Sequence, residues 1–568
     1  MRITTDTHLS YPELTLYGTI EQAALSHPTE TALDFQDRKW SFKAFVKEID
    51  SAAAALKSAG YGKGDVITIC LPNVPQALIM FYAISKIGAT ANMLHPQSAR
   101  NEIIFGLRLT GSRLILTLDM FYDTVLAAVR AMEEDVTILV TRIEDALSPV
   151  AAAAYALTQG HRYHDFPYPG EGLLWKDFLK EAKKTAKAYA VPFDRDHTGV
   201  ILYSGGTSGS PKGIALSDHS FNACAVQAKA AIDESFGLTE SMLSCMPCFH
   251  GFGLGMNLHA ALMHGVCCVL MPQFNIKTYA KMLVAKRPNY IAGVPAIFEA
   301  LLALPGMDLI RLDFLKGMFC GGDSLPVALK EKVDAFLKAH GASIQIREGY
   351  GLTESVTASC LTPREEFRSG SIGLPFPDTE YRIVEPGTDK CLPAGEIGEI
   401  VMTGPTLMQG YVGNPEETAD CLKTWADGRT WLYTGDLGAM DEEGFVFFKG
   451  RIKRMLITNG YNVYPAELEK VIEATPGVLR SCVLGISDPR RGQKIKAFVV
   501  PDGMETGADG TPVLPAEEVL SALKAAVSEE LKLNVARYAL PKEIEFRPAL
   551  PLTPLGKVDW KALEASFS

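Results

Sequence analysis

The chain has 568 residues, more than one hydrophobic core usually holds, so its length predicts a large multi-lobed body with an appended small domain. Hydrophobic residues make up 47% and charged residues 21%, a composition that excludes disordered and fibrous proteins. The formal net charge of -11 argues against a general nucleic-acid binder, which would need a basic face. We therefore expect small-molecule substrates.

Eleven cysteines, an odd number without regular spacing, do not form the pattern of a disulfide framework. Several stand in apolar runs, where cysteine behaves as a small hydrophobic residue: Cys70, Cys267, Cys268 and Cys482. Residues 1–8 lack the apolar core of a signal peptide. Together these features predict a reducing, cytoplasmic location.

The first 145 residues alternate amphipathic helices with short apolar strands, which predicts an α/β domain. We expect helices from residue 17, over 42–59 and over 74–87, and strands over 65–71, 114–118 and 136–140. Residues 146–193 are less regular, with an exposed loop followed by a surface helix over 174–189. We assign no function to this region.

A glycine- and hydroxyl-rich stretch, the phosphate loop 203–213, follows the apolar run 198–202, which is typical of a buried strand. Glycines let backbone N–H groups face an anion, hydroxyls donate further hydrogen bonds, and Lys212 adds a positive charge. The stretch lacks the common G-x-x-x-x-G-K-[ST] pattern, and Pro211 prevents a helix from starting in that register. Composition alone leaves open both a polyphosphate cradle and an ordinary surface turn.

The segment between Ser241 and Lys277 contains no Lys, Arg, Asp or Glu. It is long enough for a membrane span, but Asn257, His259 and His264 interrupt it and prolines bracket it. The pattern therefore favours a buried helix followed by a buried strand. We expect no transmembrane segment, while peripheral membrane contact stays open.

After residue 370 the pattern changes to shorter strands and turns, which predicts a small β-rich subdomain over about 370–450. Charges cluster at 450–454, and a compact α+β unit is expected beyond them. Its expected elements are helices over 465–474 and 516–531 and strands over 481–485 and 495–500. We therefore divide the chain into an N-terminal domain, 1–452, and a C-terminal domain, 453–568.

Two further stretches combine a glycine turn with a carboxylate. In residues 349–355 (Gly-Tyr-Gly-Leu-Thr-Glu-Ser) an aromatic ring could stack on a base and Glu354 could hold Mg²⁺. The alternative is a strand-to-helix turn with Thr353 as its N-cap. In residues 433–436 (Tyr-Thr-Gly-Asp), Asp436 could accept both hydroxyls of a ribose or form a simple Asx turn.

Two single residues have competing interpretations. His250, in residues 247–253 (Pro-Cys-Phe-His-Gly-Phe-Gly), is either a hydrogen-bonded core histidine or, with Cys245 and Cys248, part of a metal site. The metal interpretation is disfavoured because no second pair stands at zinc-site spacing. Lys557 follows a proline-stiffened approach on a short loop, and taken alone it is a surface charge.

Read in order from residue 203 to residue 557, these motifs resemble those of the acyl-adenylate-forming superfamily. Its members include acyl-CoA synthetases, peptide-synthetase adenylation domains and firefly-type luciferases. The resemblance implies that a carboxylate attacks the α-phosphorus of MgATP to give an acyl-AMP and pyrophosphate, and that a thiol then displaces AMP. ATP, Mg²⁺ and coenzyme A are the expected cofactors and co-substrates.

The resemblance also implies a role for each nucleotide motif. The phosphate loop would hold the departing pyrophosphate, Tyr350 would pack on adenine, Glu354 would bind the metal, and Asp436 would hold the ribose. Lys557 would clamp the substrate carboxylate and the α-phosphate. The implied nucleotide-binding residues are Ser204, Gly205, Gly206, Thr207, Ser208, Gly209, Lys212, Gly321, Gly322, Gly349, Tyr350, Gly351, Thr353, Asp436, Arg451 and Lys557. The implied catalytic residues are Lys557, Thr207, Lys212 and His250.

On the acyl side, His250 resembles the family's gate beside the substrate carboxylate. The paired glycines resemble one wall of the adenine and acyl pocket, although Asp323 stands where a small apolar residue is more usual. The implied acyl pocket consists of His250, Gly251, Phe252, Gly293, Val294 and Cys320. Lys453 resembles the hinge of a mobile C-terminal domain, whose rotation would bring the residues of the thioester step to the site: Gly460, Tyr461 and Asn462.

The leading hypothesis is an ATP-dependent acyl-CoA ligase for an apolar, fatty or aryl carboxylate. The expected acyl wall carries no charged residue, and Asp218 and Asp323 are too loosely placed to bind an amino acid's ammonium group. The alternative enzyme loads an acyl or amino acid onto a carrier-protein phosphopantetheine, because residues 550–557 resemble the ending of peptide-synthetase adenylation domains. A non-catalytic descendant is disfavoured because both Lys557 and Glu354 are present.

Overall fold

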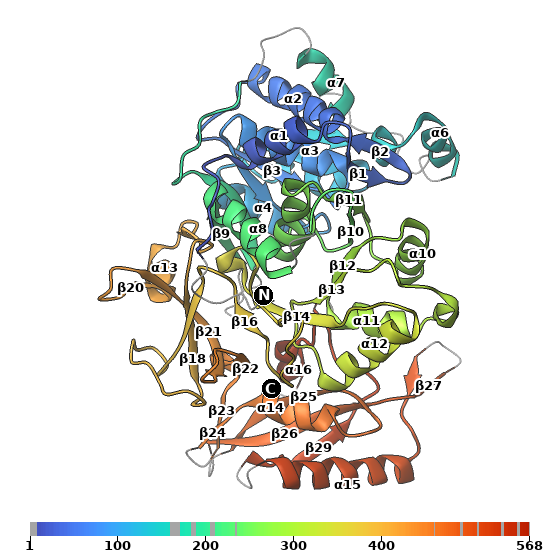
Figure 1. Ribbon diagram of the computed structural model, residues 1–568, viewed down its shortest axis with the longest axis vertical. Helices are drawn as coiled ribbons and strands as arrows, with labels where there is room; N and C mark the ends of the chain where they lie inside the picture. Colours follow the sequence, from blue (N-terminus) through green and yellow to red (C-terminus); the bar gives the residue numbers. More distant parts are fainter. Residues whose placement is uncertain are drawn as a thin grey trace.

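The computed structural model describes residues 8–158, 171–182, 189–204, 211–232, 236–458, 461–488, 492–507, 511–535, 539–553 and 557–566. Two large sheets with their helices lie in the upper and middle parts of Figure 1, and most of the elements that follow residue 455 lie at the bottom, with α16 nearer the centre. A smaller antiparallel sheet lies beside them. This architecture confirms the predicted α/β class: a large multi-lobed N-terminal part with a β-rich subdomain, and a small α+β C-terminal part.

Sheet A has the strand order β16-β15-β14-β13-β12-β10-β11-β1-β2. Its middle strands, from β14 to β1, are parallel, and antiparallel strands flank them at both edges. Parallel strands are covered on both faces, which explains why they are short, nearly continuous apolar runs. The bounds are β1 (Thr31–Phe35), β2 (Arg38–Ser41), β10 (Ser241–Ser244), β11 (Cys267–Leu270), β12 (Tyr290–Gly293), β13 (Gly317–Cys320), β14 (Ile346–Gly351), β15 (Ala358–Leu361) and β16 (Leu374–Pro375).

Sheet B has the order β19-β9-β8-β4-β3-β5-β6-β7. It is parallel from β8 to β7, whereas β8 and β9 form an antiparallel hairpin whose turn is the phosphate loop. Its strands are β3 (Val66–Cys70), β4 (Thr90–Met93), β5 (Leu114–Leu118), β6 (Thr137–Thr141), β7 (Leu173–Leu174), β8 (Thr198–Ser204), β9 (Lys212–Ser217) and β19 (Gly410–Tyr411).

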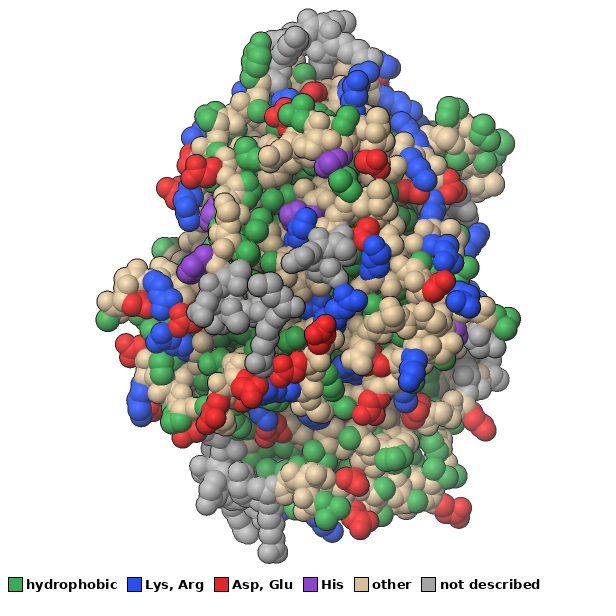
Figure 2. Space-filling model, in the orientation of Figure 1, with side chains coloured by type: hydrophobic (Ala, Val, Ile, Leu, Met, Phe, Trp, Pro, Cys, Tyr) green, Lys and Arg blue, Asp and Glu red, His purple; other side chains and the backbone are tan. Residues whose placement is uncertain are grey.

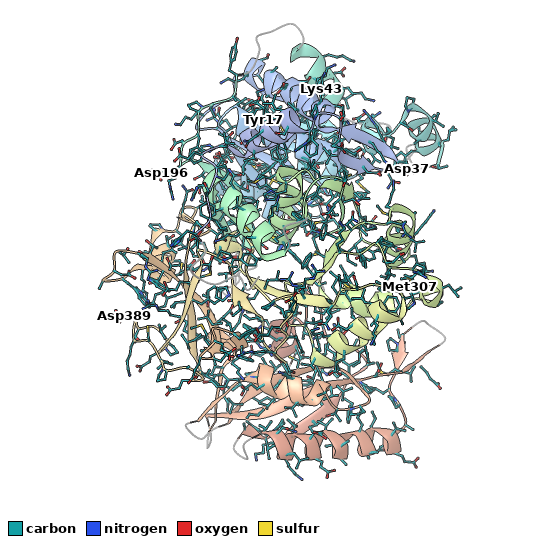
Figure 3. All side chains as sticks on the ribbon, in the orientation of Figure 1. Tyr17, Asp37, Lys43, Asp196, Met307 and Asp389 are labelled. Carbon is teal, nitrogen blue, oxygen red and sulfur yellow. The ribbon has the colours of Figure 1, made fainter. Side chains whose placement is uncertain are left out.

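Helices cover both large sheets. α1, α2 and α3 pack together at the top of Figure 1, and Tyr17 lies among them (Figure 3). The Tyr17 hydroxyl donates to Glu21 at 2.8 Å and accepts from Lys86 at 3.0 Å. The bounds are α1 (Leu16–Ser26), α2 (Phe42–Ser58), α3 (Pro75–Lys86), α4 (Arg100–Thr110), η1 (Asp119–Phe121), α5 (Tyr122–Arg130), η2 (Ile143–Ala146), α6 (Pro149–Thr158), α7 (Trp175–Ala182), α8 (Asp218–Ile232), α9 (Ala261–Met263), α10 (Ile276–Lys286), α11 (Pro295–Leu302), η5 (Met307–Leu309), α12 (Val327–Ala339) and α13 (Pro415–Cys421).

Sheet C forms the β-rich part and sheet D the centre of the C-terminal part. Sheet C is antiparallel, with the order β17-β18-β21-β20 and β22 beside β21. Its strands are β17 (Glu380–Val384), β18 (Gly398–Thr403), β20 (Leu422–Thr424), β21 (Thr430–Met440) and β22 (Val446–Arg451). Sheet D contains β23 (Leu456–Thr458), β24 (Tyr461–Val463), β25 (Val478–Asp488), β26 (Gly492–Pro501) and β29 (Glu543–Phe546), covered by α14 (Pro465–Glu473), α15 (Glu517–Asn534) and α16 (Trp560–Ala565).

The structure shows local features that the sequence patterns did not indicate. Residues 146–193, expected to be less regular, include a regular helix, α6, and residues 501–515 contain a short hairpin of β27 (Glu505–Thr506) and β28 (Pro512–Val513). The nucleotide motif does not follow the end of a strand, because β14 continues through Gly351. The first residue of the short helix η6 (Thr353–Ser355) is Thr353, so it is not an N-cap.

The apolar segment after residue 241 forms a buried helix and a buried strand, as predicted. Phe252–Ala260 is a π-helix, η4, which α9 and β11 follow. π-helical turns are rare and are frequent at functional sites. His259 lies inside η4, where its Nε2 is 2.9 Å from Asn222 Oδ1 and its Nδ1 is 3.2 Å from the Tyr82 hydroxyl. Across the described ranges, no helix combines the length and apolarity needed to cross a bilayer.

Acidic and basic side chains both lie across the face drawn in Figure 2, and neither sign covers it. This mixed surface agrees with a chain whose net charge is moderate for its size.

Two buried histidines predict acid sensitivity of the fold. Burial lowers the pKa of His259 to about 3 and that of His264 to about 4. The unfolded chain binds these protons near pH 6.5, at about the ordinary histidine pKa, so stability should fall as the pH drops from about 6.5 toward 4. Urea midpoints measured between about pH 5 and about pH 7.5 should rise with pH. His264→Gln, whose amide can still donate to the Ala225 carbonyl, should show a shallower rise; an unchanged slope would contradict the prediction.

Candidate active site

The ribose motif and the nucleotide motif meet between β14 and β21. The Tyr350 hydroxyl donates to Asp436 Oδ2 at 2.7 Å, and Arg451, which pairs with Asp436 across β21 and β22, places Nε 3.2 Å from Oδ1. Burial raises the pKa of Asp436, although Arg451 and the Tyr350 hydroxyl act against the shift. No hydrogen bond from the described residues reaches Oδ1, although that oxygen is buried. It therefore has the capacity to accept a ligand hydroxyl.

A tight backbone approach shapes the nucleotide motif. A Cβ on Gly351 would lie 1.5 Å from the Thr357 carbonyl oxygen, so only glycine fits at this position. Beyond η6, Val356 has φ 66° and ψ -61°, and the Thr357 N–H donates to the Ser355 carbonyl at 2.8 Å. This is a γ-turn centred on a β-branched residue, a conformation that costs about 1–3 kcal/mol. The strained turn directly follows Glu354 and fixes the orientation of η6.

Glu354 is the candidate metal ligand. Its Oε1 accepts a hydrogen bond from the Tyr411 hydroxyl at 3.0 Å, and its carbonyl accepts from the Met408 N–H at 2.8 Å. Within the described ranges, no cluster of three His, Cys, Asp or Glu side chains could hold an ion. Mg²⁺ is commonly held by one or two carboxylates together with substrate phosphates, so a single carboxylate fits a metal that arrives with a triphosphate.

The phosphate loop is anchored by the hairpin of β8 and β9. Ser204 and Lys212 are register partners at the end of the hairpin from which the loop leaves. The predicted residues between them, Gly205, Gly206, Thr207, Ser208 and Gly209, lie outside the described residues. The Lys212 ammonium lies 2.9 Å from Glu417 Oε2 and 4.5 Å from the ring centroid of Tyr411.

The predicted acyl and glycine walls come together at the ends of β12 and β13. Gly293 pairs with Cys320, and the Gly321 N–H donates to the Gly293 carbonyl at 3.1 Å. A Cβ built on Gly321 would lie 3.6 Å from the Phe252 ring, and one on Gly322 would lie 3.5 Å from a methyl of Val294. The start of η4 therefore faces the paired glycines.

His250 lies where the acyl side meets the nucleotide side. Its Nδ1 accepts a hydrogen bond from the Phe252 N–H at 3.2 Å. Burial and then the charge of Lys557 lower the pKa of His250 to about 4, so the ring is neutral at pH 7. A Cβ on Gly251 would lie 2.0 Å from the Val356 carbonyl oxygen, which places this segment directly against the strained turn.

The competing metal interpretation of His250 has no support. Cys245 Sγ donates to the Ala292 carbonyl and Cys248 Sγ to the Leu71 carbonyl, at 3.5 and 3.3 Å. Burial raises the pKa of both thiols to about 12. Both cysteines are therefore protonated core residues, and a thiol in this state is a poor metal ligand.

Lys557 reaches this site from the far end of the chain. Two hydrogen bonds with Thr553 fix its backbone: the Thr553 N–H donates to the Lys557 carbonyl at 2.7 Å, and the Lys557 N–H donates to Thr553 Oγ1 at 3.2 Å. Burial lowers the pKa of Lys557; Arg451 adds to this effect, and Asp323 and Asp436 oppose it. The charges of the ribose carboxylate, of its arginine and of Asp323, which follows the paired glycines, therefore all act on this lysine.

Ion pairs join the C-terminal part to the rest of the molecule. Lys449 lies 2.9 Å from Glu467 of α14, and Arg480 of β25 lies 3.6 Å from Glu299 of α11. In Figure 1 the chain end lies beside α14 and α16, toward the centre of the molecule. Both pairs form in the arrangement in which the charge of Lys557 acts on Asp436.

The predicted hinge residue lies in the link between the two parts of the chain, and the described thioester residues lie in the C-terminal sheet. Lys453 is exposed in η7 (Ile452–Arg454), which connects the last strand of sheet C to the first strand of sheet D. Tyr461 and Asn462 belong to β24, at the left edge of the lower part in Figure 1. Gly460 lies outside the described residues.

Asp218 and Asp323, the two aspartates considered as partners for an ammonium group, lie in different parts of the structure. Asp218 is buried beneath the β8–β9 hairpin, where its Oδ2 lies 3.4 Å from His197 Nδ1, so it is not part of the acyl wall. Asp323 is exposed after the paired glycines, and its charge acts on Lys557 and on Arg454 of the C-terminal part.

Sequence reasoning missed Tyr411 and Glu417. Tyr411 ends β19 and Glu417 lies in α13, in a stretch whose sequence is typical of an ordinary turn before a short helix. Only their contacts with Lys212 and Glu354 indicate a role at the site. In the sequence they appear only as an aromatic and a charged side chain near Gly410 and Gly413, a pattern that is too common to indicate a site.

Known proteins are similar to this chain over most of its length. A long-chain-fatty-acid–CoA ligase of Bacillus subtilis (strain 168) is 32% identical over 97% of this chain and 94% of its own length. A feruloyl-CoA synthase of Amycolatopsis sp is 32% identical over 65% of this chain and 70% of its own. Among solved structures, the anthranilate CoA ligase AuaEII in complex with anthranoyl-AMP covers 99% of both chains with a TM-score of 0.81 and 24% identity, a likeness of fold alone.

Two family models match as well. Residues 20–412 match the model described as AMP-binding enzyme, and residues 467–557 match the AMP-binding enzyme C-terminal domain. The order of motifs from residue 203 to residue 557 is thus accompanied by matches over most of the chain. The chain belongs to the AMP-binding enzyme family.

Proposed function

We propose that this protein is an ATP-dependent acyl-CoA ligase that activates an apolar carboxylate as acyl-AMP and transfers the acyl group to the thiol of coenzyme A. The observation that carries the proposal is the buried Lys557, on which the charges of Asp436 and Arg451 act and whose own charge acts on His250, since these residues come from distant parts of the chain. The names of relatives, which include ligases of long-chain fatty acids and of ferulate, support the same reaction class.

The first step joins two anions, so the residues act by alignment and charge neutralisation. Asp436 accepts the ribose hydroxyls through its unsatisfied buried oxygen, and Tyr350 packs beside the base. Lys557 then lies where the substrate carboxylate and the α-phosphate must approach each other, and its ammonium offsets their negative charge. Glu354 would hold Mg²⁺, which neutralises phosphate charge when bound. Thr207 and Lys212 hold the departing pyrophosphate.

The geometry also supports an apolar acid. The wall formed by Phe252, Gly293, Val294 and Cys320 has no charged side chain, and Asp218 is engaged by His197 instead of facing this wall. His250 is neutral, so it can act as a hydrogen-bonding neighbour of the carboxylate without pairing with it permanently.

For the thioester step we propose that the C-terminal domain, residues 453–568, rotates against the N-terminal domain, residues 1–452, about Lys453. The ion pairs of Lys449 with Glu467 and of Arg480 with Glu299 would break, Lys557 would withdraw, and β24 would approach the site. These surface pairs contribute only about 0–1 kcal/mol each, so they permit such a motion.

A panel of fatty, aryl and amino acids tests the first step when acyl-AMP is trapped with hydroxylamine. We expect turnover of apolar acids and at least about 10-fold lower kcat/KM for amino acids, because the wall offers no partner for an ammonium group. Equal or better turnover of an amino acid would overturn the substrate class. In a second arm, free coenzyme A and a phosphopantetheinylated carrier protein compete as acceptors; transfer to the carrier alone would establish the alternative ligase.

A further inference from the structure

We propose that Glu417 holds the phosphate-loop lysine, Lys212, in a parked position from which a triphosphate or pyrophosphate must displace it. This inference rests on the proposed function, because it concerns the same phosphate site. The Lys212 ammonium lies 2.9 Å from Glu417 Oε2 and 4.5 Å from the centroid of the Tyr411 ring. Tyr411 belongs to β19 and Glu417 to α13, so both contacts reach the lysine from these two elements.

Glu417 is built into its position. The Asn414 side-chain amide donates to Glu417 Oε2 at 2.9 Å, and the Glu417 N–H donates to Asn414 Oδ1 at 3.1 Å. Asn414 therefore both caps α13 and orients the Glu417 carboxylate. The ion pair is therefore more ordered than a chance pair of flexible side chains. Its partners remain 22% and 38% exposed, which leaves room for an incoming anion to compete.

Tyr411 connects the parked lysine to the candidate metal ligand. Its ring lies against the Lys212 ammonium, and its hydroxyl donates to Glu354 Oε1 at 3.0 Å. Its N–H donates to Thr418 Oγ1 at 2.9 Å, which ties the ring to the helix that carries Glu417. Tyr411 is thus a positioning residue that spans the two groups expected to meet the β- and γ-phosphates.

The exchange has a consequence for product release. A polyphosphate carries several negative charges and attracts the lysine more strongly than one carboxylate does, so Lys212 transfers to it on binding. The ion pair between Lys212 and Glu417 breaks when the polyphosphate binds, and it forms again when pyrophosphate leaves. Glu417 therefore weakens the binding of pyrophosphate and favours its departure.

Glu417→Gln in the full chain tests this role by calorimetric titration with inorganic pyrophosphate in the presence of Mg²⁺. Removing the competing carboxylate should lower the Kd of pyrophosphate by about 3- to 5-fold, the range expected for loss of a partly exposed ion pair. Glu416→Gln is the matched control, since it removes the same charge from the neighbouring residue of α13, and its Kd should stay at the wild-type value.

Two outcomes would overturn the parked state: an unchanged or raised Kd in Glu417→Gln, or equal tightening in both variants, which would indicate a general charge effect. Failure of the wild-type protein to bind both ATP and pyrophosphate would instead overturn the proposed function. Tyr411→Phe provides an independent readout, because it keeps the ring beside Lys212 and removes the hydroxyl from Glu354. Its pyrophosphate affinity should fall in the presence of Mg²⁺ and remain at the wild-type value without the metal.

Discussion

Replacing Lys557 by alanine should reduce the rate of acyl-AMP formation by about 10²- to 10³-fold, the loss typical of removing one group that stabilises developing charge. Lys557 is a group of the C-terminal part whose charge acts on both Asp436 and His250. We expect the N-terminal motifs to make most of the contacts with ATP, so its Kd should stay within about threefold of the wild-type value. Acid-dependent ATP–pyrophosphate exchange measures the rate, and calorimetry measures ATP binding.

Lys524→Ala is the control for this variant, since it removes a lysine from the exposed face of α15 in the same part of the chain. Lys557→Arg adds a test by pH. Burial lowers the pKa of Lys557, so the wild-type exchange rate should fall at a lower pH than the ordinary lysine value of about 10.4 would give. The arginine variant keeps its charge and should lose this alkaline decline. Unimpaired exchange in Lys557→Ala would remove the lysine from the mechanism.

The sequence alone predicted helices with a regular amphipathic pattern and strands that are fully buried. The apolar run 114–118 coincides with β5, and the amphipathic pattern over 42–59 became α2. The helix α6 was missed although alanine favours helices, because its run of apolar residues lacks the periodic polar face that marks a surface helix. Its exposed Val150 and Leu157 do not follow the pattern on which the prediction relied.

The nucleotide motif shows where local reasoning ends. Residues 349–351 look like a turn because they contain two glycines, yet they lie in β14, which pairs with β13 on one side and β15 on the other. Pairing with distant strands overrides the local preference. The glycine is required for a different reason, the approach of the Thr357 carbonyl, which only the three-dimensional structure reveals.

The roles of the site residues came from resemblance, and the structure adds the contacts that resemblance could not supply. The pairing of Lys212 with Glu417 joins residues far apart in sequence, and neither composition nor spacing indicates it. Asp323 was noted as a departure from the family pattern, and its place beside Lys557 and Arg454 relates that departure to the contact between the two parts of the chain. Charge interactions of this kind depend on the fold as a whole.

Replacing Asp436 by alanine should raise the Kd of ATP by about 100-fold, because a buried carboxylate that accepts ligand hydroxyls contributes about 1.5–3 kcal/mol through charge-assisted hydrogen bonds. The change also leaves the Tyr350 hydroxyl and the Arg451 guanidinium without their shared partner, so some loss of stability should accompany it. Asp427→Ala, in an exposed turn of the same sheet, is the control for removing one carboxylate.

A cycle with dideoxy-ATP, which lacks both ribose hydroxyls, separates the hydrogen bonds from any distortion of the pocket. The wild-type protein should prefer ATP over dideoxy-ATP by about 100-fold, and Asp436→Ala should bind both nucleotides equally, because the partner of the hydroxyls is then gone. If the variant kept the preference, the buried oxygen of Asp436 would not be the ribose acceptor. If both nucleotides bound equally to the wild-type protein, Asp436 would serve only to hold Arg451 through Oδ1 and Tyr350 through Oδ2, and the nucleotide would have to lie elsewhere.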